Sequence, residues 1–112
     1  MRTISRDELR SKLNEYPGRT LLIDVRDRGD YETEHIRGAI SIPISELEMR
    51  AAKSFSPDQE VIVYCGGFDC PASARAAKIL DRQGFRDVIE YKGGLADWKT
   101  AGFLTEGRAK AA

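Results

Sequence analysis

The chain has 112 residues, a length that fits a single domain with one hydrophobic core. Its 18 Lys and Arg residues balance 18 Asp and Glu residues, so no net charge attracts nucleic acid or an anionic membrane. No apolar run approaches the roughly 20 residues of a membrane-spanning helix, and the opening MRTISRDELR lacks the apolar stretch of a secretory signal. We therefore expect a cytoplasmic protein with neither nucleic acid nor a membrane as partner.

The first quarter of the chain predicts a helix between two strands. Thr3-Ile4 is compatible with a brief strand, and Ser5 and Glu8 have the spacing of a capping box that opens a helix. Pro17-Gly18 ends this helix. The apolar run Thr20–Val25 then predicts a buried strand.

The next segment predicts shorter elements. A polar turn or short helix is expected at Tyr31–His35, followed by a strand at Ala39–Ile42. Ser45 and Glu48 have the spacing of a second capping box, which would open a helix to about Lys53.

The second half of the chain continues the alternation of strands and helices. The predicted elements are Val61–Tyr64, Ser73–Gln83, Val88–Tyr91 and Leu95–Thr100. Such alternation favours an α/β fold with a parallel sheet covered by helices on both faces. The last residues, TEGRAKAA, have little to bury. The predicted organisation is therefore one domain, residues 1–104, and a loose C-terminal tail, residues 105–112.

Cys65 falls where the buried strand Val61–Tyr64 ends and a helix is about to begin. In parallel sheets this position opens onto the crevice at the carboxyl ends of the strands, where ligands bind. Loop amides and the positive end of a helix stabilise an anion there and favour thiolate over thiol. Gly66 and Gly67 permit close approach of a ligand. The setting favours a nucleophile over the alternative, a cysteine that fills space in the core.

The cysteine and histidine content predicts neither a disulfide framework nor a metal site. Cys65 and Cys70 are too close in sequence to cross-link distant elements, and a reducing cytosol argues against a structural bridge. With a single histidine the chain lacks a convincing zinc-ligand set, although carboxylates could complete one in principle. We expect no metal and no other cofactor.

Two further features are assigned to structural support. Asp24 ends a buried strand and is followed by Arg26, and a carboxylate in that position normally needs such a partner. The two residues are predicted to form an ion pair that braces the loop. Trp98, the only tryptophan, is predicted to pack its ring on the sheet.

Three stretches stand in order between Ile4 and Leu104: IDVRDRGDYETEHIRGAISIP at Ile23–Pro43, the strand, loop and helix around Cys65, and GGLADWKTAGF at Gly93–Phe103. Together they resemble the rhodanese family of single-domain sulfurtransferases. The resemblance implies a rhodanese-like α/β domain with about five parallel strands. It also implies transfer of sulfane sulfur from a small-molecule or protein donor, such as thiosulfate or a persulfide, to a thiophilic acceptor.

The resemblance carries the nucleophile over to Cys65, which would hold the transferred sulfur as a persulfide. Successive backbone amides of the loop and the helix start would stabilise the persulfide anion without a metal. The residues of this binding loop are Gly66, Gly67, Phe68, Asp69, Ala72 and Ser73.

The loop departs from the common family pattern at one position. The family usually has Arg five residues after the cysteine, whereas this chain has Cys70 there, in a longer loop without Arg. Asp69 would oppose a dianion such as thiosulfate. Arg75 lies within the predicted helix, where it could point back to the pocket, but exposure to solvent is the favoured expectation. The Cys-x4-Cys loop resembles a subgroup of rhodanese-like domains, and Cys70 would either resolve the Cys65 persulfide or pack under the loop.

Three classes of protein stay open: a sulfurtransferase, a thiol redox or non-catalytic rhodanese-like binding module, and a phosphatase or arsenate reductase with a similar cysteine loop. Silent modules typically lack the cysteine. Phosphatases need an Arg clamp at the end of the loop, and neither Cys70 nor Pro71 provides it. Sulfur transfer is the favoured prediction.

Overall fold

The computed structural model describes residues 1–110 and contains two sheets. The larger sheet has five strands, in the spatial order β1 (Arg2–Thr3), β6 (Asp87–Tyr91), β5 (Glu60–Tyr64), β2 (Leu21–Asp24) and β4 (Ile40–Ser41). Every neighbouring pair in it runs parallel. The smaller sheet pairs β3 (His35–Ile36) with β7 (Thr105–Glu106) in antiparallel fashion. The predicted α/β fold with a five-stranded parallel sheet is confirmed.

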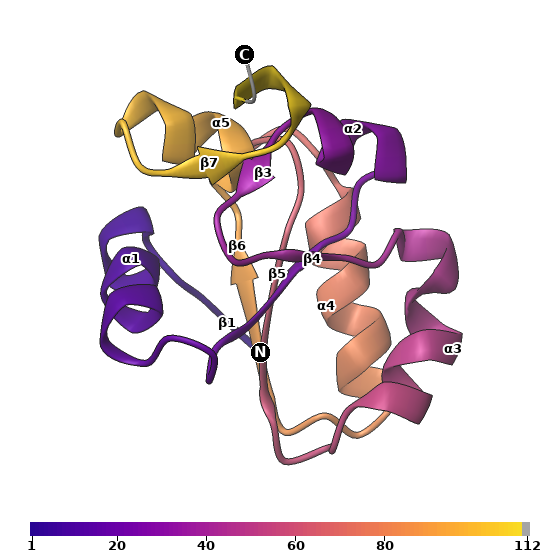
Figure 1. Cartoon of the computed structure of the whole chain (residues 1–112). Coiled ribbons are helices and arrows are strands. Elements are labelled where there is room, and N and C mark those ends of the chain that lie inside the picture. The colour runs from indigo at the N-terminus through magenta and orange to yellow at the C-terminus, as the bar shows by residue number, and fades with distance from the viewer. Residues whose placement is uncertain (111–112) are drawn as a thin grey trace.

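Helices cover both faces of the large sheet (Figure 1). One face carries α1 (Arg6–Glu15) and α5 (Gly94–Thr100), and the other carries α3 (Ile44–Ser54) and α4 (Ala72–Arg82). The short helix α2 (Arg28–Thr33) and a 3₁₀ turn at Arg108–Lys110 lie near the C-terminal end of the chain. Within residues 1–110, no helix is both long and apolar enough to cross a membrane.

The central strand β5 contributes to two hydrophobic clusters, one on each face of the sheet. Val61 and Val63 pack against the side of α3 and α4, whereas Ile62 and Tyr64 pack against the side of α1 and α5. All four side chains are fully buried. Because alternate residues of a strand point to opposite faces, burial on both faces explains the unbroken apolar run in the sequence.

One of the two predicted capping boxes is present. Ser5 Oγ accepts a hydrogen bond from the Glu8 amide, and Glu8 accepts one from the Ser5 amide, so α1 begins as predicted. The second, at Ser45, is wrong, because α3 already begins at Ile44. The Ile44 amide donates to the Val25 carbonyl at 3.1 Å. The end of β2 therefore satisfies this amide, and no side-chain cap is formed at Pro43.

The smaller sheet corrects two expectations. The segment Tyr31–His35 is not one turn or helix, because α2 ends at Thr33 and His35 begins β3. The loose tail is wrong for residues 105–110, because β7 pairs with β3. Thr105 Oγ1 also donates to Glu34 Oε2 at 2.7 Å. Residues 111–112 of the expected tail lie outside the described part of the chain.

Candidate active site

Cys65 lies at the carboxyl edge of the large sheet, directly after β5 and seven residues before α4 begins at Ala72. The strand places it there because β5 is the middle of the five strands, with β2 and β6 ending beside it. In Figure 1 the connection from β5 to α4 runs at the same end of the molecule as the start of α5. The predicted position at a strand end and before a helix is confirmed.

The Cys65 side chain is covered rather than open. It is 1% exposed and belongs to the hydrophobic cluster under α3 and α4. The structure joins it to Cys70 in a disulfide, with the two Cα atoms 6.5 Å apart. Cys70 is partly buried against the same cluster. The expected crevice over Cys65 is therefore closed in this oxidised form. The argument against a bridge is wrong here, because the two cysteines of one loop come together without linking distant elements.

The loop between the two cysteines turns back on itself. The Cys70 amide donates to the Gly67 carbonyl at 3.1 Å. Within residues 1–110, the amides of Gly66, Gly67, Phe68 and Asp69 have no hydrogen-bond acceptor. The Phe68 side chain, 73% exposed, stands out from the loop. The described part of the chain therefore leaves four successive amides of this loop without an acceptor.

The start of α5 clamps the loop from the other side. The amides of Leu95 and Ala96 donate to the carbonyls of Cys65 and Gly66, at 3.0 and 2.9 Å. A Cβ atom at Gly94 would lie 2.5 Å from the Cys65 carbonyl oxygen, and Gly94 has a φ of +62°. Only glycine fits this close approach. The double glycine was visible in the sequence as part of a family resemblance, but its contact with the loop was not.

Ser73, predicted as part of the binding loop, has a side chain that is engaged elsewhere. It is 1% exposed, and its Oγ donates to Glu90 Oε2 at 2.8 Å. The hydroxyl is therefore committed to β6, and only the Ser73 backbone amide in the first turn of α4 can face the loop. Sequence reasoning missed Glu90. Its signal is a charged residue between the apolar residues Ile89 and Tyr91 of β6.

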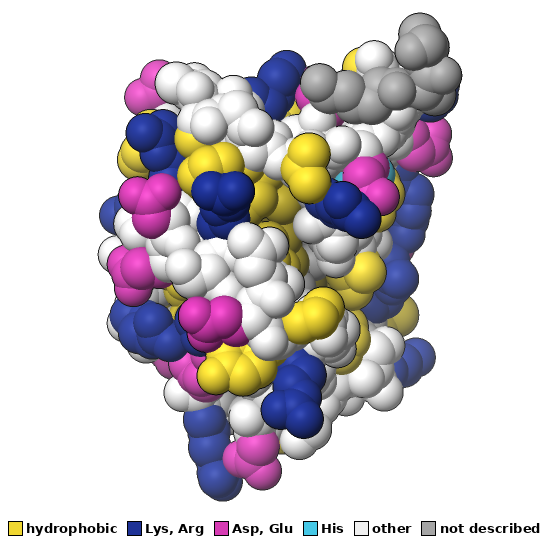
Figure 2. All heavy atoms as spheres, turned by 60° about the vertical axis from the view of Figure 1, so that its left-hand side comes forward, with side chains coloured by type: hydrophobic (Ala, Val, Ile, Leu, Met, Phe, Trp, Pro, Cys, Tyr) yellow, Lys and Arg dark blue, Asp and Glu magenta, His cyan; other side chains and the backbone are white. Residues whose placement is uncertain are grey.

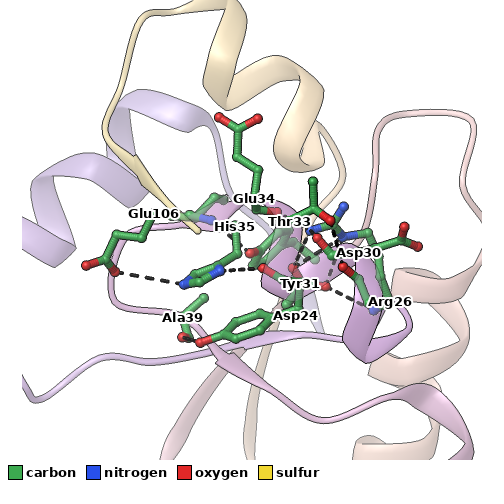
Figure 3. Close-up of polar contacts among 12 residues, drawn as sticks. Asp24, Arg26, Asp30, Tyr31, Thr33, Glu34, His35, Ala39 and Glu106 are labelled. Atoms are coloured by element: carbon green, nitrogen blue, oxygen red, sulfur yellow. Dashed lines mark hydrogen bonds and ion pairs between the residues drawn. The ribbon is translucent and has the colours of Figure 1, made fainter. Parts of the chain in front are cut away.

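The predicted ion pair at the end of β2 is present (Figure 3). Asp24 is fully buried, and its carboxylate accepts hydrogen bonds from Nε and Nη2 of Arg26, the shortest distance being 2.8 Å. Arg26 Nη2 also donates to the Glu34 carbonyl at 2.7 Å. Burial works against the charge of Arg26, but the hydrogen bond and the charge of Asp24 outweigh it and raise the pKa of the guanidinium. The pair ties β2 to the segment after α2.

Tyr64, the residue before the cysteine, is held in a neutral state. Burial raises the pKa of its phenol, and the neighbouring Asp24 carboxylate raises it further. The hydroxyl accepts a hydrogen bond from the Ile36 amide at 3.0 Å. This contact, which the sequence did not indicate, fixes the end of β5 against β3.

The sequence of the chain matches one known protein family over most of its length. The family described as Rhodanese-like domain matches residues 5–101 of the chain. The chain belongs to the rhodanese family. The resemblance seen in the three sequence stretches is thereby confirmed.

Relatives within the rhodanese family include proteins of different architecture. The thiosulfate sulfurtransferase GlpE of Coxiella burnetii is 34% identical over 79 residues, 70% of this chain and 71% of that protein. The HTH-type transcriptional regulator Rv0324 of Mycobacterium tuberculosis is 38% identical over 85 residues. That match covers 76% of this chain but only 37% of the regulator. The chain thus spans little more than a third of that relative.

A solved rhodanese-like domain has the same fold. The solution structure of this domain from the Anabaena protein Alr3790 superposes with a TM-score of 0.87 at 36% identity. The alignment covers 97% of this chain and 81% of the Anabaena domain.

The rhodanese loop of this chain carries no cation. Arg75, the first arginine after Cys65, is exposed on α4 as expected, and Asp69 is exposed in the loop. An anionic substrate would therefore meet backbone amides and no guanidinium within residues 66–71.

Trp98 packs on the sheet as predicted. It is 3% exposed, meets Tyr91 and Phe103 edge-on, and donates from Nε1 to the Leu104 carbonyl at 2.9 Å. Trp98 also lines a groove of about 770 Å³ between α1 and the end of α5. Figure 2 shows this face hollowed, with hydrophobic side chains in the floor and basic side chains at the rim. Of the described residues, none from the loop 66–73 lines this groove.

Proposed function

We propose that this chain is a sulfurtransferase that carries sulfane sulfur on Cys65 as a persulfide. The observation that supports the proposal most is the placing of Cys65 under a loop of unpaired amides, between the end of β5 and the start of α4. Membership of the rhodanese family supports the same reaction class.

The proposed reaction has two steps and begins with the reduced protein. In the first, the Cys65 thiolate attacks the outer sulfur of thiosulfate or of a persulfide. The sulfur–sulfur bond of the donor breaks, and sulfite or a thiol leaves. In the second, an acceptor thiolate or cyanide attacks the outer sulfur of the Cys65 persulfide, and the Cys65 thiolate leaves.

The loop amides would stabilise the anion that forms at each step. The persulfide places its negative charge on the outer sulfur, one bond beyond Cys65. The amides of Gly66 to Asp69, in the loop that follows, have no other acceptor among the described residues. The clamp of α5 on the Cys65 and Gly66 carbonyls keeps this part of the loop in place. Donors already ordered in the protein need not reorganise during the reaction.

The charge of the loop predicts a preference among donors. Asp69 and the lack of a loop arginine disfavour the dianion thiosulfate relative to a persulfide with fewer negative charges at the reacting end. A steady-state assay of the reduced protein with each donor and cyanide as acceptor tests the proposal. We expect thiocyanate from both donors, with the larger kcat/KM for glutathione persulfide. No thiocyanate above background from either donor would contradict the proposed function.

A thiol redox role is a second candidate, favoured by the disulfide between Cys65 and Cys70. A redox protein would exchange its disulfide with dithiol substrates at useful rates without any sulfane sulfur. Reduction of the disulfide by a dithiol, coupled to no sulfur transfer in the assay above, would favour this candidate.

We expect no hydrolysis of phosphate monoesters. The loop offers backbone amides but no guanidinium to hold a phosphate by two hydrogen bonds, and Asp69 repels the substrate charge. The measurement is turnover of an aryl phosphate by the reduced protein, with Cys65→Ser as control. Turnover that disappears in the variant would assign phosphoryl chemistry to Cys65 instead.

A further inference from the structure

We propose that Cys70 resolves the Cys65 persulfide, which gives the chain a second activity, the reduction of bound sulfane sulfur to free sulfide. The inference rests on the proposed function, because the persulfide is its starting point. It is carried by the disulfide, in which the Cα atoms of Cys65 and Cys70 are 6.5 Å apart. This separation lies inside the roughly 4.4–6.8 Å range of protein disulfides.

The backbone of the loop holds the two thiols at one place. On one side, α5 fixes the carbonyls of Cys65 and Gly66 by the two hydrogen bonds from its first turn. On the other side, Cys70 is followed directly by Pro71, the N-cap of α4. Between them the bond from the Cys70 amide to the Gly67 carbonyl closes a turn. Because both ends of the loop are anchored, the two sulfurs meet without movement of a distant element.

The places of the two thiols in the fold differ. Cys65 directly follows the buried strand β5 and is 1% exposed in the disulfide form, whereas Cys70 belongs to the loop that covers it. The chain has no other cysteine. Cys70 is therefore the one thiol of the same molecule that can attack a persulfide on Cys65.

The resolving step balances in atoms and electrons. The Cys70 thiolate attacks Sγ of Cys65, so the bond between the two cysteine sulfurs forms and the bond from Cys65 Sγ to the outer sulfur breaks. The outer sulfur leaves with the electron pair as hydrosulfide. It is thereby reduced, and the two cysteine sulfurs are oxidised to the disulfide found in the structure. Two equivalents of a low-molecular-weight thiol then reduce the disulfide and complete the cycle.

The test compares reduced wild type with the reduced Cys70→Ser variant, each loaded once and then freed of donor and thiols. Thiosulfate is the first donor, because released sulfite counts loading and released sulfide counts resolution. Glutathione persulfide is the second donor, with intact mass as the measure of loading. We expect sulfide release from wild type to be faster than from the variant by a factor of roughly 100 or more, since the attack is intramolecular.

The masses and the concentration dependence complete the test. Wild type should end two hydrogens lighter than its reduced form, while Cys70→Ser stays one sulfur heavier. The first-order rate constant of sulfide release should not change when the wild-type concentration is varied. Equal persulfide lifetimes in the two proteins, or a rate constant that rises with protein concentration, would overturn the role of Cys70 and leave the sulfurtransferase function standing. Absence of loading by both donors in both proteins would instead overturn the proposed function, and this inference with it.

Discussion

Replacing Cys65 by serine should reduce sulfur transfer by roughly 10⁴-fold or more, to the background rate, because the covalent carrier of the sulfur is removed. Serine has nearly the same size, but its hydroxyl would lie in a site that is 1% exposed. An unpaired buried hydroxyl costs about 1–3 kcal/mol, so the Cys65→Ser protein should fold with a modest loss of stability. The measurements are thiocyanate formation and the free energy of unfolding of both proteins in reducing buffer.

A second variant separates catalysis from stability. Cys65→Ala removes the sulfur without burying a hydroxyl, and it should be as inactive as Cys65→Ser while unfolding closer to wild type. Reducing buffer is needed because either change also removes the disulfide to Cys70. Transfer at the wild-type rate in the alanine variant would show that Cys65 is not the nucleophile.

Truncating Trp98 to alanine should destabilise the protein by about 3–5 kcal/mol, the usual cost of removing a buried aromatic side chain. The ring is 3% exposed and packs edge-on against Tyr91 and Phe103. The change also leaves the Leu104 carbonyl without its indole donor. Chemical denaturation of the reduced protein measures the loss, and activity per folded molecule should be retained.

Tyr16→Ala is the matched control for this truncation. Tyr16 is also aromatic but 50% exposed, at the end of α1, so its loss should change the free energy of unfolding by about 0.5 kcal/mol or less. A Trp98→Ala protein with unchanged stability and lost activity would mean that the ring contacts a substrate through the groove it lines.

Regular patterns in the sequence were enough to predict most of the fold. The unbroken apolar run of β5 is diagnostic because both faces of the sheet are covered, and the box at Ser5 is satisfied entirely within its own helix. The box at Ser45 has the same spacing but fails. There the carbonyl of Val25, distant in sequence, takes the first amide of α3. A local sequence pattern cannot reveal an acceptor that comes from another part of the chain.

The smaller sheet shows the same limit. Strands β3 and β7 have two residues each, too few for an alternating pattern, and they are 69 positions apart at Ile36 and Thr105. A polar contact accompanies their pairing: Thr105 of β7 donates a hydrogen bond to Glu34, the residue before β3. A polar tail therefore becomes part of the fold through long-range contacts alone.

Some features of the candidate site are predictable from the sequence and others are not. The place of Cys65 and the pairing of Asp24 with Arg26 follow from where strands end, so the sequence predicts both. The covering of Cys65 by Cys70 depends on how the loop turns. The contact of Gly94 with the loop joins segments far apart in the chain. These features require the three-dimensional arrangement.

The most direct test of the sulfurtransferase account is the location of the added sulfur. Reduced wild-type protein is exposed briefly to thiosulfate or to glutathione persulfide, quenched with acid and alkylated, and the peptide that contains both cysteines is fragmented in a mass spectrometer. We predict one additional sulfur on Cys65 at the earliest times. No added sulfur with either donor, or a sulfur found on Cys70 while Cys65 carries none, would contradict the account.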